Sequence, residues 1–166
     1  LTLTNNTQLS SDINSVSTAA GIYSTVVNVD GDINVIGKNV GGTGLQIING
    51  TGTGITTLGD FNISSTMSGN TTNVVLGHAA KVTSYQNITL NSVAGGATNL
   101  YIGDSMYGAP TDISAKNIDM TGSGDNKVIF NNNINNPTST GYFFDVAING
   151  NGSVVQQSGH TTLSAV

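Results

Sequence analysis

The chain of 166 residues has no cysteine, tryptophan, glutamate or arginine, and only two prolines. The absence of cysteine excludes a disulfide framework and thiolate metal sites. The basic side chains are four scattered lysines against nine aspartates, a net charge of -5, so we expect no nucleic-acid partner. No apolar run approaches the roughly 18 residues that a membrane-spanning helix needs, so we expect no membrane insertion.

Four small polar residues, Gly, Asn, Thr and Ser, fill half of the chain. A further 37% of the residues are apolar, with Val and Ile the most numerous, which is more than a disordered Gly/Ser linker contains. Because β-branched residues favour strands and the length is that of one domain, we predict a single all-β domain.

A short apolar segment recurs along the chain at nearly constant intervals. Its copies are residues 45–47, 74–76, 100–102, 128–130 and 154–156. They start 29, 26, 28 and 26 residues apart, a period typical of one coil in a repeat protein. A unit of this size cannot bury its apolar face alone and must stack on copies of itself.

Two further segments recur with a similar period, and glycine-rich turns separate the three. One series comprises residues 34–36, 62–64, 87–89, 117–119 and 147–149, and the other comprises residues 55–58, 82–85, 113–115 and 143–145. We therefore predict a right-handed parallel β-helix over residues 1–166, a β-solenoid of about six coils with three short strands each. At about 4.8 Å per coil it would be roughly 30 Å long.

Side chains alternate between the two faces of a strand, so each series also predicts which residues face outward. In the second series the central aliphatic residues should point into the interior: Ile63, Ile88, Ile118 and Ile148. The asparagines before them should form a polar outer face: Asn62, Asn87 and Asn117. Such a face could associate with a second copy of the chain, or it could simply be solvated.

The first series predicts a second outer column, which is apolar over four coils. Its members are Gln46, Val75, Tyr101, Ile129 and Val155. Exposed apolar stripes of that size usually mark a binding partner. Two alternatives stay open: a neighbouring loop, such as residues 131–137, covers the stripe, or the inner and outer faces are exchanged.

The C-terminal segment, residues 143–166, resembles the passenger-associated transport repeat of bacterial autotransporters. In that pattern an aliphatic-x-Gly-x-Gly-Ser-aliphatic strand precedes a glycine turn and a Thr-x-Leu strand. The matching residues are Ile148, Gly150, Gly152, Ser153, Val154, Gly159, Thr161 and Leu163. The chain departs from the pattern near Gln156, where the family usually has a basic residue, and it lacks the second strand with a Gly-Gly-Thr corner.

The resemblance implies a secreted β-helical passenger, threaded through an outer-membrane β-barrel of the same precursor and displayed on a Gram-negative cell surface. Passengers of this kind commonly act as adhesins, as aggregation factors or as stalks for a separate catalytic domain. No capping element is evident at either end, so we expect a fragment of a longer passenger. We predict a non-catalytic role in adhesion or cell-cell aggregation, with another cell, a host receptor or a glycan as partner. The alternatives are a passive stalk and a phage or surface-layer β-solenoid.

Two short motifs suggest chemistry, and each has a simpler interpretation. Residues 103–106 resemble the Gly-Asp-Ser signature of serine hydrolases, but only His78 and His160 could supply the base that such a serine needs. Residues 30–34 contain the first ligands of a calcium loop and lack its central glycine and its final glutamate. We therefore predict no catalytic residue, no metal site and no cofactor.

A polysaccharide-cleaving β-helix is the enzymatic alternative, because two aspartates at the right separation could act as acid and base. The candidates are Asp104, Asp112, Asp119, Asp125 and Asp145. Their positions in turns and on solvent-facing strand positions favour ordinary surface carboxylates.

Overall fold

The computed structural model describes residues 2–3, 7–11, 20–23, 26–37, 43–48, 54–77, 80–103, 111–131, 142–159 and 161–164. Within these ranges every regular element is a β-strand. All of the strand pairs are parallel, as expected for a chain that repeats a three-strand unit.

Three sheets form the walls of the molecule. Sheet A contains β1 (Thr2–Leu3), β4 (Val26–Val29), β7 (Gly54–Thr57), β10 (Lys81–Ser84) and β13 (Asp112–Ser114). Sheet B contains β2 (Thr7–Ser11), β5 (Ile33–Gly37), β8 (Phe61–Ser65), β11 (Ile88–Ser92), β14 (Asn117–Gly122) and β17 (Ala147–Gly150). Sheet C contains β3 (Ala20–Tyr23), β6 (Thr43–Ile48), β9 (Thr71–Gly77), β12 (Ala97–Ile102), β15 (Asp125–Asn131) and β18 (Ser153–Ser158).

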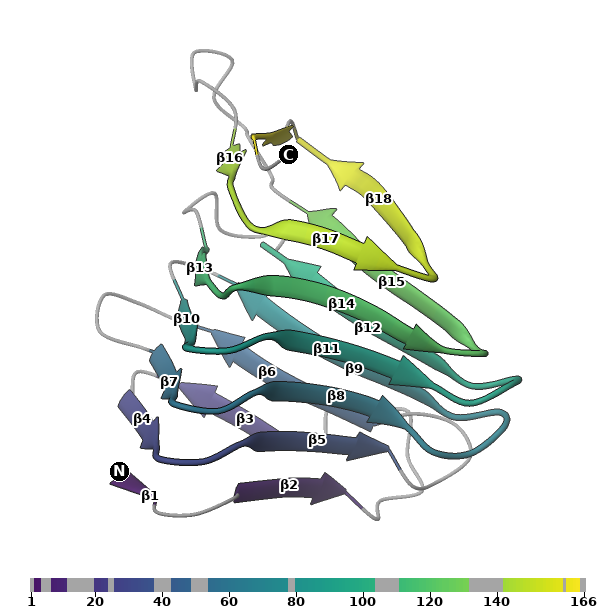
Figure 1. Ribbon diagram of the computed structural model, residues 1–166, viewed down its shortest axis with the longest axis horizontal. Coiled ribbons are helices and arrows are strands. Elements are labelled where there is room, and N and C mark those ends of the chain that lie inside the picture. The colour runs from purple at the N-terminus through teal and green to yellow at the C-terminus, as the bar shows by residue number, and fades with distance from the viewer. Residues whose placement is uncertain are drawn as a thin grey trace.

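The chain passes from sheet A to sheet B to sheet C and back again, so each circuit adds one strand to each wall. In Figure 1 the strands of sheet B run to the right at the front, those of sheet C run to the left behind them, and the circuits rise toward the C-terminus. This is the course of a right-handed coil. In the last circuit β16 (Tyr142–Phe144) precedes β17 and β18, and it pairs in a separate two-stranded sheet with β19 (Thr161–Leu163), which follows them. The predicted right-handed parallel β-helix is confirmed.

The apolar series found in the sequence lies in register in sheet C. Its Cα partners follow one another as Leu45, Val74, Leu100, Val128 and Val154. In sheet A the third series is aligned in the same way through Ile55, Val82 and Ile113. The irregular spacing of the repeats therefore comes from connections of different length, while the strands themselves stay in register.

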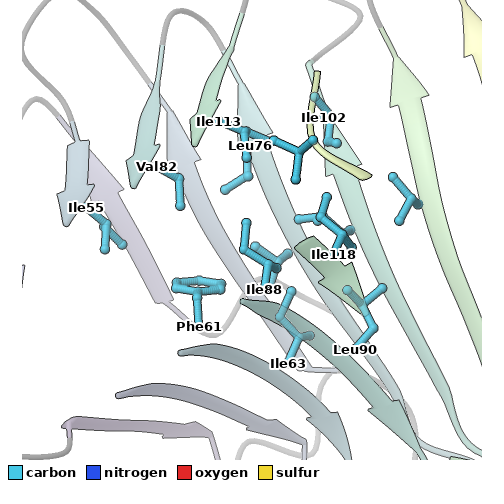
Figure 2. Packing of buried hydrophobic residues seen from close by; sticks show 14 of the residues in the cluster. Ile55, Phe61, Ile63, Leu76, Val82, Ile88, Leu90, Ile102, Ile113 and Ile118 are labelled. Carbon is cyan, nitrogen blue, oxygen red and sulfur yellow. The ribbon is translucent and has the colours of Figure 1, made fainter. Parts of the chain in front are cut away.

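The interior is filled by side chains that point inward from all three sheets (Figure 2). In β8 and β11, for example, every second residue is buried. Ile63, Ile88 and Ile118 are fully buried, as predicted, and Ile148 packs against the same core while partly buried. Full burial of one such side chain stabilises the fold by roughly 1.5 to 3 kcal/mol.

We call the bend between a strand of sheet A and the following strand of sheet B the A/B corner. At this corner, side-chain oxygens accept hydrogen bonds from the backbone of the next coil. Asp32 Oδ1 accepts a bond from the Asp60 backbone N–H at 2.8 Å. Asp60 Oδ1 in turn accepts one from the Asn87 N–H at 2.9 Å. The bend takes these N–H groups out of the regular ladder, and the carboxylates supply the acceptors that they need.

At the B/C corner, where the chain passes from a strand of sheet B to the following strand of sheet C, glycines with positive φ form the turn. The Asn70 N–H donates to the Met67 carbonyl and the Gly96 N–H donates to the Val93 carbonyl, each closing a four-residue turn. The third residues of these turns are Gly69, with φ of 77°, and Gly95, with φ of 74°. That position of a type II turn requires a positive φ, which glycine adopts without steric cost.

Buried polar side chains line the inner side of the B/C corner. Asn126 Oδ1 accepts hydrogen bonds from Ser92 Oγ and Thr98 Oγ1, and all three residues are buried. The Asn126 side-chain amide donates to the Thr121 carbonyl at 2.6 Å and to the Asn151 carbonyl at 3.3 Å. A buried polar group is tolerated because it has partners, and here one asparagine connects three successive circuits.

Candidate interaction faces

The predicted outer column of sheet C exists as a register of the backbone. Its members are consecutive Cα partners across five strands, and we call them the sheet C stripe: Gln46, Val75, Tyr101, Ile129 and Val155. Their spacing along the chain is uneven, yet the ladder aligns them.

The sheet C stripe is only partly accessible where its side chains are described. Val75 and Tyr101 are half-buried, Val155 is 37% exposed, and Ile129 is only 7% exposed. Ile129 lies outside the core cluster and is flanked in its column by Tyr101 and Val155. A partner of this stripe would therefore meet Val75, Tyr101 and Val155 before it could reach Ile129. Residues 132–140, which include most of the loop that could cover the stripe, lie outside the described residues.

The polar outer face of sheet B also exists, with a register that differs from the predicted one. The Cα partner of Asn62 is Thr89, and the partner of Thr89 is Asp119. The recurring series aligns Asn62 with Asn87, and that alignment is wrong by two residues, whereas Ile88 and Ile118 are Cα partners as the series aligns them. A shift of two keeps every side chain on its predicted face, because side chains alternate with a period of two.

The outer column of sheet B begins at Gln8 in β2 and continues through five further strands, whose members we call the sheet B column. Its members are Asn34, Asn62, Thr89, Asp119 and Asn149. The Asn62 side-chain amide donates to Asn34 Oδ1 at 3.0 Å, and the Asn149 amide donates to Asp119 Oδ1 at 3.3 Å. In Figure 1 sheet B faces the viewer, and no described strand lies over it.

Asn87 lies at the A/B corner beside that column, and Asn117 is the first residue of β14. The Asn117 side-chain amide approaches Asn87 Oδ1 at 3.4 Å. The Asn87 backbone N–H donates a hydrogen bond to Asp60 Oδ1 of the previous coil. The two asparagines thus continue, with amides, the ladder that Asp32 and Asp60 begin with carboxylates.

Sheet A presents the third outer face. Its central column consists of Asn28, Thr56, Thr83 and Ser114. On the neighbouring column Lys81 Nζ lies 3.4 Å from Asp112 Oδ2, with both side chains well exposed. Thr56 and Thr83 are half-buried, as are Asn62 and Thr89 on sheet B. The three faces can therefore be compared at matched positions of the same two circuits.

A second amide pair lies on sheet C, next to the stripe. The Asn99 side-chain amide donates to Asn73 Oδ1 at 2.8 Å. Asn99 Oδ1 is buried and has no hydrogen-bond partner among the residues that the structure describes. Lys127, the Cα partner of Asn99 in the following strand, forms an ion pair with Asp125.

A shallow groove of about 600 Å³ follows the B/C corner across three circuits. Its walls are residues 69–71, 95–97 and 123–125. The corners stack so closely that a Cβ atom at Gly124 would overlap the carbonyl oxygen of Val93. Five of the nine lining residues are Gly or Ala, and Asp125 is the charged one.

Of the five aspartates considered for acid-base chemistry, three lie on different walls. Asp112 belongs to sheet A, Asp119 to sheet B and Asp125 to sheet C. Each lies at a half-buried or exposed position. Within the part of the chain that the structure describes, no group of three or more metal-ligating side chains occurs.

The two sequence motifs have separate outcomes. In the Asp30 to Asn34 motif, Asp32 accepts a backbone hydrogen bond at the corner, and Asn34 belongs to the sheet B column. Residues 104–106 of the Gly-Asp-Ser motif, His78 and His160 lie outside the described residues.

Comparisons with known proteins identify no family. No family model, no curated protein and no solved structure matches this chain. Among the described residues no helix is long and apolar enough to span a membrane. The fold is thus known from the structure, while the function has to be argued from the outer faces.

Proposed function

We propose that this chain is a non-catalytic segment of an autotransporter passenger, displayed on or released from a Gram-negative cell, that mediates adhesion or cell-cell aggregation. The proposal rests on two lines of support. The C-terminal residues 143–166 resemble the passenger-associated transport repeat, and β17, β18 and β19 are strands at the corresponding positions. The fold is the right-handed parallel β-helix that this resemblance implies.

The observation that carries the adhesive role is the sheet B column. Five polar side chains stand in register on an outer face that no described strand covers. Neighbouring members are hydrogen-bonded along the axis, Asn62 to Asn34 and Asn149 to Asp119. The amides of Asn62 and Asn149 are therefore held in fixed orientations, and the column presents one polar side chain per coil. This order reduces the entropy lost when a partner binds.

The physical mechanism is repetition. One exposed hydrogen bond contributes only about 0.5 to 1.5 kcal/mol after competition with water. A rigid wall presents several such contacts at coil spacing, and many copies on one cell act together, so weak contacts add up to strong attachment. A second copy of the same wall, a host receptor or a glycan could each use this geometry.

The sheet C stripe is the second contact surface in this proposal. Tyr101 and Val155 offer apolar area that the sheet B column lacks, and aromatic residues often supply much of the binding free energy at interfaces. Ile129 is already almost fully buried. Charge substitutions at Ile129 would therefore disturb folding, and the stripe should be tested at Val75 and Tyr101.

The test uses matched lysine pairs on the three walls of the same two circuits. The passenger that contains this chain is displayed on a non-adherent bacterium, and settling of the culture is measured. The variants are Asn62→Lys with Thr89→Lys on sheet B, Val75→Lys with Tyr101→Lys on sheet C, and Thr56→Lys with Thr83→Lys on sheet A. Surface amounts of each variant are compared by antibody labelling.

We expect settling of cells with the native passenger, a several-fold slower settling for the sheet B pair, and little change for the sheet A control. Slower settling for the sheet C pair alone would indicate that the contact is made by the sheet C stripe. Equal settling of all variants and of cells without the passenger would reject self-association; binding to host cells or glycans would then be measured with the same variants. Failure of the native passenger in both assays would favour a passive stalk.

A further inference from the structure

At the end of β17 and in the corner that follows it, asparagine and glycine alternate in the order Asn149, Gly150, Asn151, Gly152. Gly150 has a φ of 95°, a conformation that L side chains rarely adopt. A Cβ atom at Gly152 would lie 2.6 Å from the Asn126 carbonyl oxygen and would overlap the sulfur of Met120. Packing of this corner on the previous circuit thus requires glycine after each asparagine.

Glycine after asparagine exposes the asparagine side chain to a known reaction of the peptide backbone. The amide nitrogen of the following residue can attack the side-chain carbonyl carbon, and a side chain at that following position would hinder the attack. Asn34 and Asn62 are followed by Val35 and Ile63, whose branched side chains hinder it. The same fold that places asparagines along sheet B therefore protects some of them and exposes others.

We propose that Asn151 is a site of spontaneous covalent modification in the folded protein. The Gly152 nitrogen loses its proton to solvent base and forms a bond to Cγ of Asn151. The bond between Cγ and the side-chain nitrogen breaks, and ammonia leaves with a proton taken from solvent. Water then opens the five-membered succinimide at one of its two carbonyls, which gives aspartate or isoaspartate at position 151.

The structure favours Asn151 over Asn149, although both precede a glycine. Asn151, Gly152 and Gly150 are all exposed. Among the described residues the Gly152 N–H has no hydrogen-bond acceptor. Asn149 lies within β17, in register with Asp119, and its side-chain amide donates to Asp119 Oδ1. Ring closure at Asn149 would require the extended strand to open locally, so it should be slower.

Modification would act on the corner and on the buried polar group below it. The product carries one additional negative charge. In the isoaspartate form the main chain gains a methylene between the Cα of residue 151 and the carbonyl before Gly152. In the unmodified chain the Asn151 carbonyl accepts a hydrogen bond from the Asn126 side-chain amide at 3.3 Å. Asn126 would then keep its bond to the Thr121 carbonyl and lose its contact with the last circuit.

The experiment incubates the folded chain at mildly alkaline and at mildly acidic pH and follows the amide-to-acid mass gain by peptide mapping. Fragment ions assign the gain to a residue, and enzymatic methylation of isoaspartate confirms the product. The native chain is compared with Asn151→Gln, which disfavours the five-membered ring, and with the matched control Asn149→Gln. A sample unfolded in urea shows the intrinsic rates at the Asn149-Gly150 and Asn151-Gly152 pairs.

We expect the mass gain at residue 151 to grow with time and to be faster at alkaline pH. It should vanish in Asn151→Gln and persist in Asn149→Gln, while Asn34 and Asn62 stay unmodified. In urea, residues 149 and 151 should convert at similar rates. The proposal is overturned if the folded chain shows no gain at residue 151, or if residue 149 converts as fast in the folded chain. This test is independent of the adhesion assay.

Discussion

The A/B and B/C corners solve the same problem in different ways. At the A/B corner, Asp32 and Asp60 accept backbone N–H groups from the next coil, and the polar atoms stay half-exposed. At the B/C corner, glycines with positive φ turn the chain, and Ser, Thr and Asn side chains are buried beneath the bend. The A/B corner is thus stabilised by half-exposed side-chain acceptors, and the B/C corner by glycine turns above a buried hydrogen-bond network.

This difference predicts that the two corners contribute unequally to stability. A buried hydrogen-bonding group without its partner costs about 1 to 3 kcal/mol, whereas a group that can turn to water costs less. Substitutions at the B/C corner should therefore lower the free energy of unfolding more than substitutions at the A/B corner. The following changes test that ranking, from the largest expected effect to the smallest.

Asn126→Ala should have the largest effect. It removes the acceptor of the Ser92 and Thr98 hydroxyls and the donor to two backbone carbonyls. We expect the free energy of unfolding to fall by roughly 2 to 4 kcal/mol, measured by urea unfolding with circular dichroism. An effect below that of the A/B corner substitutions would contradict the proposed ranking.

Gly122→Ala should be the next most damaging change. Gly122 has a φ of 86°, and a Cβ atom there would overlap the Ser92 carbonyl oxygen. The positive φ alone costs roughly 1 to 2 kcal/mol for a non-glycine residue, and relief of the overlap adds to it. Ser123→Ala, at the exposed next residue, is the control and should stay within about 0.5 kcal/mol of the native chain.

Asp60→Ala tests the A/B corner and should cost about 1 kcal/mol. It removes the acceptor of the Asn87 N–H, which solvent can partly replace because Asp60 is half-buried. Asp60→Asn keeps a side-chain oxygen at the same place and should cost less than Asp60→Ala. If the two variants were equally unstable, the ladder of backbone acceptors would not explain the corner.

Asn62→Ser should have the smallest effect, within about 0.5 kcal/mol, because it removes one half-exposed hydrogen bond, to Asn34 Oδ1. Thermal unfolding followed by circular dichroism checks this. A melting temperature close to that of the native chain would establish that the sheet B column can be altered without damage to the wall. A large decrease would show instead that the column serves mainly to stabilise the solenoid.

The sequence contains enough information to predict the walls, because each wall repeats an inward aliphatic residue. It aligned the sheet C stripe correctly, and it aligned sheet A correctly as far as β13; the last member of that series, residues 143–145, falls at β16, which pairs with β19 instead. In sheet B it paired Ile63 with Ile88, whereas the partner of Ile63 is Leu90. The Asn-Ile pair occurs two residues earlier in β11 than in β8, and a period of two leaves both alignments equally amphipathic. The two alignments differ only in the lengths of the connections between the strands, and the structure provides these lengths.

The corner roles of Asp32, Asp60 and Asn126 could not be predicted in the same way. Asp32 and Asp60 occur in ordinary turn sequences, and their function depends on which coil lies above them. Asn126 looks like one more polar residue in a chain with 22 asparagines. Its burial follows from the tight stacking of three corners, which is a tertiary effect. Residues 30–31 form a bend that leads into β5, as an Asp-Gly sequence favours.

Force spectroscopy between two single bacteria that display the passenger tests the central claim most directly, because it measures cell-cell contact through the outer walls. The native passenger should give frequent adhesion events with repeated rupture steps. Asn62→Lys with Thr89→Lys should reduce their frequency several-fold, and Thr56→Lys with Thr83→Lys on sheet A should leave it unchanged. Equal adhesion frequency for the native passenger and both lysine pairs would contradict the account.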